Sequence, residues 1–267
     1  NSLISLNSLM TAPLRPLRTL LPLGALARRR NACSLTTNNS TPFPVKEILD
    51  FLSDLHDNNN REWFEANRER YRRVLQKHNA NVERLIELIS EFDPSVEGAT
   101  IASSTYRIYR DTRFSKDKTP YKDFFSAFIV RGGKRSGYGG YYLHISPKGH
   151  TWGEGSFLAA GNVCPEPEVL RSMREEIEDH AEEMVDNISR SGFSLTTDNS
   201  LKRTPRGFSV APEYEYLLRQ RELCLSRPIT SEWLLQPDWL EQTAELFSRC
   251  KPFLDQVNRA IEYAKFL

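Results

Sequence analysis

The order of the hydrophobic patterns along the chain restricts its fold more than any other feature of the sequence. Apolar residues first recur at i, i+3, i+4 and i+7 over residues 48–55, which is helical spacing. Residues 123–130 and 140–146 are then rich in aromatic and β-branched side chains, as expected of strands. Helical spacing returns over residues 166–190 and 237–266. The sequence therefore predicts an α+β fold with N-terminal helices, a central antiparallel sheet and C-terminal helices.

Weaker patterns complete this prediction. Further helices are expected over residues 61–76 and 81–91, and Asn67 lies in the apolar row of the first of them. We expect the Asn67 amide to bond to the backbone rather than to a ligand. Residues 104–111 favour a third strand and the glycine-bearing residues 151–158 a fourth, so the sheet is predicted to have three to four strands.

The N-terminus differs in composition from the rest of the chain. Residues 1–46 hold six basic residues and no acidic one, which leaves 30 basic and 35 acidic residues in the remainder. An acid-free leader rich in Arg, Ser and Leu is typical of an organelle transit peptide, here mitochondrial, with processing expected after Arg28–Arg30. A plastid leader and a secretory signal over Thr19–Ala27 are the alternatives. We expect residues 1–43 to be this leader and residues 44–267 to be a single domain without a membrane span.

Residues 107–122, RIYRDTRFSKDKTPYK, are the part of the chain in which charged and aromatic side chains are most concentrated. Guanidinium and ammonium groups that converge from a loop suit phosphate or carboxylate oxygens. The structural alternative is that Asp111 and Asp117 simply pair with neighbouring cations on a solvated surface. The candidate ligand-binding residues are Arg107, Arg110, Arg113, Lys116, Lys118 and Lys122, joined by Lys202, Arg203 and Arg206 of a second basic segment.

Asp111 and His144 are the candidate acid or base groups. Strand alternation places His144 on the same face as Tyr142 and Ser146. A sheet histidine that is hydrogen-bonded to a neighbour is the plainer interpretation. The spacing of His144, His150 and Glu154 matches no established metal-ligand motif, and the sequence identifies no cofactor.

The chain resembles an uncharacterised family, domain of unknown function 2461. The resemblance spans about residues 44–267 and is strongest in the 107–122 segment. Ala211–Pro212 departs from it, because the family tends to show a His–Pro pair there. The family implies a shared domain and conserved positions, but no activity. The other matching segments are NNNREWFEANRERY at 58–71, GYYLHISP at 140–147, LRSMREEI at 170–177 and LKRTPRGF at 201–208.

Binding of an anionic or phosphorylated small molecule through residues 107–122 is the leading functional hypothesis, with turnover left open. An RNA-associated module would instead use Tyr109, Phe114 and Tyr121 as stacking surfaces beside the arginines. A structural protein that binds a partner and no small ligand is the third hypothesis. The sequence lacks the glycine-rich phosphate-binding loops of common nucleotide-binding proteins. It also lacks the G-x-S-x-G motif of serine hydrolases and the H-E-x-x-H motif of zinc proteases.

The composition of the leader generates a direct prediction. Residues 1–46 fused to a fluorescent reporter should carry it to mitochondria and be cleaved near Asn31–Ser34, because presequences are basic and acid-free. Microscopy and N-terminal sequencing of the recovered reporter check both parts. An uncleaved reporter spread through the cytosol would refute the prediction.

Overall fold

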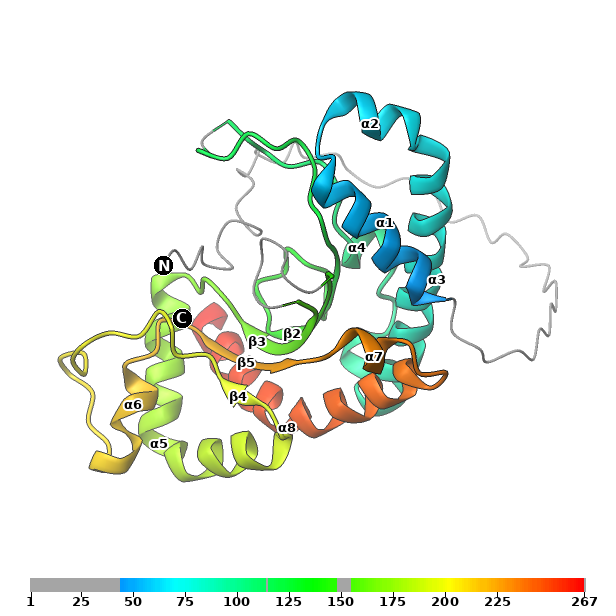
Figure 1. Cartoon of the computed structure of the whole chain (residues 1–267). Helices are drawn as coiled ribbons and strands as arrows, with labels where there is room; N and C mark the ends of the chain where they lie inside the picture. Colours follow the sequence, from blue (N-terminus) through cyan, green and yellow to red (C-terminus); the bar gives the residue numbers. More distant parts are fainter. Residues whose placement is uncertain (1–43, 114, 148–154, 267) are drawn as a thin grey trace, which may run out of the picture.

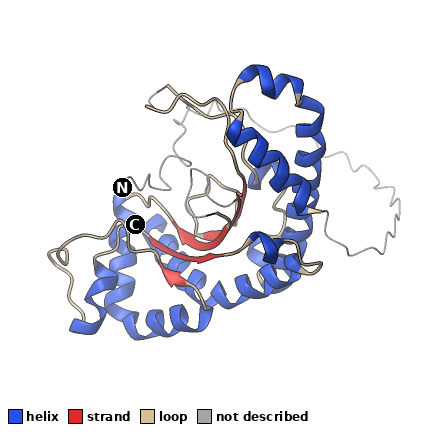
Figure 2. Cartoon of the chain, viewed as in Figure 1, coloured by secondary structure: helices blue, strands red, loops and turns tan. Residues whose placement is uncertain are grey.

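The computed structural model describes residues 44–113, 115–147 and 155–266. Within this part of the chain, eight α-helices flank one antiparallel sheet of five strands, drawn in red in Figure 2. The predicted α+β class is therefore confirmed. The helices are α1 (Val45–Asp57), α2 (Arg61–Ala66), α3 (Arg68–Phe92), α4 (Ile101–Ser104), α5 (Pro167–Ser191), α6 (Glu215–Leu218), α7 (Ser231–Leu234) and α8 (Trp239–Phe266), and the strands are β1 (Phe125–Ile129), β2 (Gly140–Ile145), β3 (Phe157–Asn162), β4 (Ser194–Leu195) and β5 (Leu223–Pro228).

The N-terminal helices differ from the prediction in where they break. The helix expected over 61–76 is interrupted at Asn67, whose side-chain amide donates to the Trp63 carbonyl at 2.9 Å. The expected bond from Asn67 to the backbone is confirmed. The helix expected over 81–91 is not separate, because α3 runs unbroken to Phe92. The buried His78 ring stacks on Phe125 with centroids 4.9 Å apart, and this packing on the sheet keeps the intervening turn helical.

The strands follow the order β1-β2-β3-β5-β4 and pair antiparallel throughout. The two strands expected over 123–130 and 140–146 are confirmed as β1 and β2. The fourth expected strand is displaced, since β3 covers 157–162 and residues 151–154 lie outside the described part of the chain. β4 and β5 were not predicted. β4 has only two residues, and β5 follows charged residues and becomes a strand through its long-range pairing with β3.

The strand expected over 104–111 is wrong. Only isolated bridges connect this segment to its neighbours, from Thr105 to Ala127 and from Tyr109 to Tyr121. The chain leaves the edge of the sheet here, and Pro120 has no N–H with which to continue a ladder. The segment is extended without becoming a sixth strand.

The two faces of the sheet have different surroundings. Alternate residues such as Ala127, Leu143 and Leu158 belong to the main core, which α1, α3 and α8 also supply. Figure 1 shows α5 and α8 running along this side of the sheet. On the other face, Phe128 and Tyr142 form part of a second, smaller apolar cluster. No helix in the described part of the chain combines the length and apolar character needed to cross a membrane.

The continuity of the main core generates the second prediction. Its buried residues extend from Val45 in α1 to Ile261 in α8, so separate unfolding of one half would expose the core of the other. We therefore expect a chain truncated to residues 44–267 to melt in one cooperative transition. Calorimetry and circular dichroism should give the same midpoint. Two well-separated transitions would contradict a single domain.

Candidate functional site

Residues 107–122, called the arm below, project from the edge of the sheet beside β1 (Figure 1). Two backbone hydrogen bonds hold its halves together, from Arg110 N–H to the Pro120 carbonyl at 3.0 Å and from Lys122 N–H to the Ile108 carbonyl at 2.8 Å. Ile108 is buried while Tyr109 is 45 % exposed, because successive side chains of an extended segment point in opposite directions. The arm is thus a hairpin-like extension whose base belongs to the core. Phe114 lies outside the described residues.

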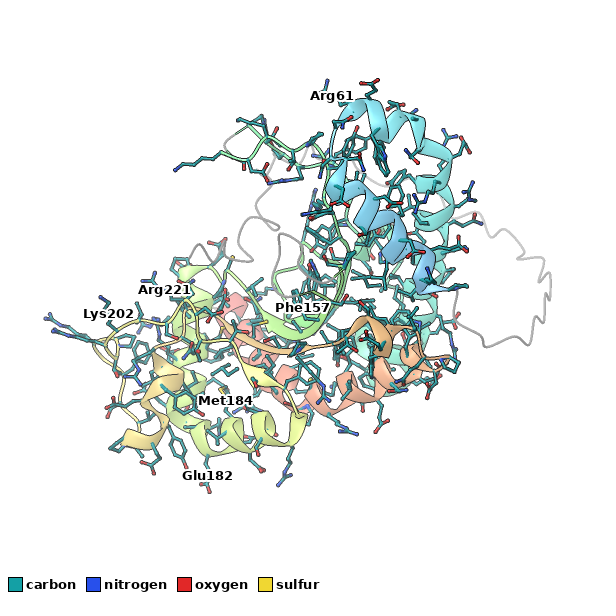
Figure 3. The ribbon with its side chains drawn as sticks, in the orientation of Figure 1. Arg61, Phe157, Glu182, Met184, Lys202 and Arg221 are labelled. Atoms are coloured by element: carbon teal, nitrogen blue, oxygen red, sulfur yellow. The ribbon has the colours of Figure 1, made fainter. Side chains whose placement is uncertain are left out.

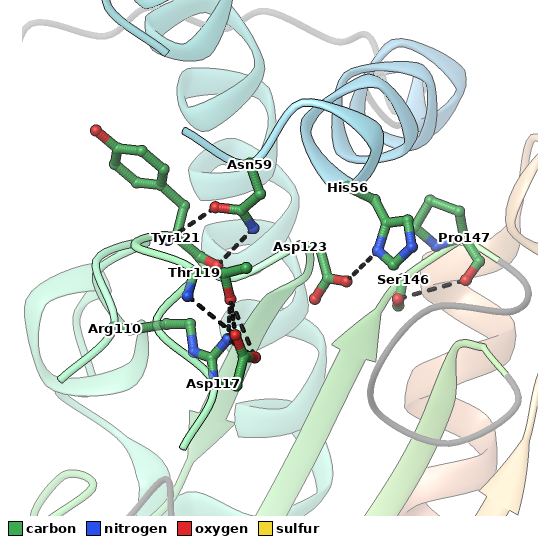
Figure 4. A network of polar contacts seen from close by, with 9 residues as sticks. All are labelled: His56, Asn59, Arg110, Asp117, Thr119, Tyr121, Asp123, Ser146 and Pro147. Carbon is green, nitrogen blue, oxygen red and sulfur yellow. Dashed lines mark hydrogen bonds and ion pairs between the residues drawn. The ribbon is translucent and has the colours of Figure 1, made fainter. Parts of the chain in front are cut away.

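Asn59, between α1 and α2, clamps the base of the arm (Figure 4). Its Oδ1 accepts from the Tyr121 N–H at 3.1 Å, and its Nδ2 donates to the Tyr121 carbonyl at 3.0 Å. The Tyr121 ring is buried and stacks on Phe64 with centroids 4.0 Å apart. Tyr121 therefore has no free face for a nucleic-acid base, whereas Tyr109 remains partly exposed.

An ion pair occupies the outer part of the arm. Arg113 Nε donates to Asp111 Oδ1 at 2.9 Å, and its Nη2 donates to Oδ2 at 2.6 Å. These bonds lower the pKa of Asp111 to about 2, so its carboxylate is ionised and engaged at neutral pH. Asp111 is exposed on the arm, whereas His144 is buried in the sheet. The two candidate acid or base groups therefore lie in different environments.

Two more cations of the arm bond within it. Arg110 pairs with Asp117 and also donates to the Thr119 hydroxyl (Figure 4). Lys118 Nζ donates to the Thr112 carbonyl at 2.8 Å. Lys116 is exposed. Many of the charged side chains of this segment therefore bond to other residues of the arm and stabilise its conformation.

Lys122, at the base of the arm, has a different environment. Its Nζ lies 5.3 Å from the centroid of the Tyr106 ring and 5.7 Å from that of Phe124. Burial lowers the pKa of Lys122 to about 8, and repulsion from Arg107 and Arg110 adds to the effect. Aromatic faces attract an ammonium group only modestly. Across the described residues, no carboxylate forms an ion pair with Lys122.

His144 is fully buried in β2. The Tyr142 hydroxyl lies 3.2 Å from His144 Nδ1, so the expected bond to a neighbour is confirmed. The imidazole lies against Phe124 and Phe157, with ring centroids 4.5 and 4.7 Å away. Burial lowers the pKa of His144 to about 3, opposed by the charge of Asp123 and assisted by that of Lys122. His144 is therefore neutral at physiological pH.

The structure also reveals a histidine–carboxylate pair that the sequence analysis missed. His56 Nδ1, at the end of α1, lies 2.7 Å from Oδ2 of the buried Asp123 (Figure 4). Asp123 directly follows Lys122 but contacts His56 of another element. Sixty-seven positions separate the partners, and no local pattern marks such a contact. Asn59 and Tyr106 were missed for the same reason.

The second basic segment does not join the arm. Lys202, Arg203 and Arg206 are exposed on the connection between β4 and α6. Figure 3 shows Lys202 extending from the tip of this connection, well apart from the arm. The structure therefore brings Arg107, Arg110 and Lys122 together at the base of the arm and leaves the second segment separate.

The clamp by Asn59 generates the third prediction. Asn59→Ala removes both bonds to the Tyr121 backbone and should destabilise the protein by roughly 1 to 3 kcal/mol, with faster hydrogen exchange at the Tyr121 amide. Asn58→Ala is the control, because the Asn58 side chain donates to the nearby Asp54 carbonyl and forms no hydrogen bond to the arm in the described part of the chain. Equal exchange of the Tyr121 amide in both variants would show that the clamp does not hold the arm.

The comparisons with known proteins give one positive result. The family model described as "Conserved hypothetical protein (DUF2461)" matches residues 47–255, which include the arm and all five strands. No curated protein and no solved structure matches the chain. Because the match spans most of the sequence, the chain belongs to the conserved hypothetical protein family DUF2461.

Proposed function

We propose that this protein binds an anionic or phosphorylated ligand at the base of the arm. One observation carries the proposal: a largely buried lysine, Lys122, with cationic neighbours and no carboxylate bonded to it within the described residues. An anion that accepts from Lys122 and approaches Arg107 would supply the missing negative charge. No reaction is proposed.

The environment of Lys122 differs from that of other cations in the chain. Arg131 pairs with Glu262 and Arg259 with Glu176, each across long sequence separations. The lowered pKa of Lys122 corresponds to roughly 3 kcal/mol against its charged form, a cost that an ordinary structural lysine avoids by staying in water. A bound oxyanion would offset this cost, so the site favours negative ligands.

The RNA-associated alternative has less support. It needs several exposed aromatic faces beside the arginines, and Tyr121 is committed to Phe64. Arg110 and Arg113 are also engaged with carboxylates. A site at the base of the arm suits a small anion better than an extended polynucleotide.

Lys122→Met is the fourth prediction, because it keeps an unbranched side chain only one atom shorter and removes the charge. Titration with pyrophosphate should show at least about a tenfold loss of affinity, as expected for one charge-assisted hydrogen bond. The melting temperature should be unchanged or higher, since a poorly solvated charge is gone. Lys116→Met makes the same substitution at an exposed position of the arm and should bind almost normally.

The pH dependence of binding provides a further check. Lys122 must be protonated to hold the anion, so wild-type affinity should fall as the pH rises from 7 through about 8 to 9. Lys122→Met should lack this fall. Equal affinities for wild type and both variants would refute the proposed function. Equal losses of affinity in both variants would also refute it, because binding would then depend on general surface charge and not on the site at Lys122.

A further inference from the structure

A buried nitrogen of β2 has no hydrogen-bond partner within the described part of the chain. His144 is 0 % exposed, and its Nε2 bonds to no atom of the described residues. Buried polar atoms in native proteins nearly always have a partner, which can be protein, water or ligand. An unpartnered nitrogen on a fully buried imidazole therefore needs a physical explanation.

The hydrogen bond between Tyr142 and His144 Nδ1 determines whether His144 Nε2 carries a hydrogen. The pKa of Tyr142 is raised by burial, so its phenol is protonated at physiological pH. A neutral imidazole nitrogen is a better acceptor than a phenolic oxygen, so the Tyr142 O–H donates to His144 Nδ1. The single imidazole proton then lies on Nε2. The unpartnered atom is thus an N–H donor without charge.

The aromatic neighbours of His144 include a ring that Lys122 shares. Phe124 and Phe157 both pack against the His144 ring and restrict its rotation. The ring of Phe124 also contacts the Lys122 ammonium. Repulsion from the Lys122 charge also contributes to the lowered pKa of His144, after burial. One charged donor and one neutral donor therefore lie next to the same phenylalanine.

We propose that His144 Nε2–H is a second donor to the ligand held by Lys122. This inference rests on the proposed function and narrows the ligand to an oxyanion with at least two acceptor oxygens, such as a phosphate group. A neutral N–H contributes direction without adding charge, so it selects for the position of an oxygen. Lys122 provides the electrostatic attraction and His144 the second point of contact.

The test compares His144→Phe with Lys122→Met in pyrophosphate titrations at several salt concentrations. His144→Phe keeps an aromatic ring between Phe124 and Phe157 and removes the donor. We expect roughly a tenfold loss of affinity with the salt dependence of the wild type, because only a neutral hydrogen bond is lost. Lys122→Met should lower both the affinity and its salt dependence.

The imidazole can also be observed directly in the wild-type protein. Nitrogen-15 NMR should show a neutral His144 with hydrogen on Nε2, and the Nε2–H signal should shift when pyrophosphate is added. Tyr142→Phe is the control, because it removes the bond to Nδ1 that holds this tautomer. The NMR result is independent of whether His144→Phe folds.

The outcomes separate the two proposals. Normal binding by His144→Phe, or an Nε2–H signal that does not move with pyrophosphate, would overturn the role of His144 and leave the Lys122 site standing. Loss of salt dependence in His144→Phe would also overturn it, since a neutral donor carries no charge. Normal binding by Lys122→Met would overturn the proposed function itself.

Discussion

The packing of α8 against the sheet, α3 and α5 is the constraint on which the rest of the structure depends. Trp239, Phe247 and Phe253 of this helix are fully buried in the main core. Because the core occupies one face of the sheet, strand alternation directs Tyr142 and His144 to the other face. The position of the candidate site therefore follows from which face of the sheet packs against the main core.

Desolvation, rather than charge density, distinguishes the base of the arm from its tip. The exposed pair of Asp111 and Arg113 remains in contact with water, and such pairs add little stability. Lys122 loses contact with water and has no carboxylate partner among the described residues, and His144, which contacts the same Phe124 ring, is neutral because it is buried. Two donors with different charges thus lie within one aromatic environment, which suits recognition of an oxyanion.

Local patterns predicted the features that depend on local sequence. The apolar stripes of α1, α5 and α8, strands β1 and β2, and a bond from His144 to a neighbour follow from spacing and alternation. The break at Asn67 and the pairing of β5 with β3 depend on contacts formed only in the folded chain.

The same limit applies to the site. The sequence singled out residues 107–122 but could not separate Lys122 from the other five cations, because only folding buries it between Tyr106 and Phe124. The clamp from Asn59 to Tyr121 crosses sixty-two positions and has no local signature.

The proposed function depends on Lys122 being a cation that folding removes from water. Its side-chain pKa can be measured by carbon-13 NMR of the Cε atom across pH 6 to 11, with and without pyrophosphate. The account predicts a midpoint near pH 8 in the free protein and a clear upward shift with pyrophosphate, because a bound anion favours the charged amine. A free-protein midpoint near the ordinary lysine value of about 10.4, unchanged by pyrophosphate, would contradict it.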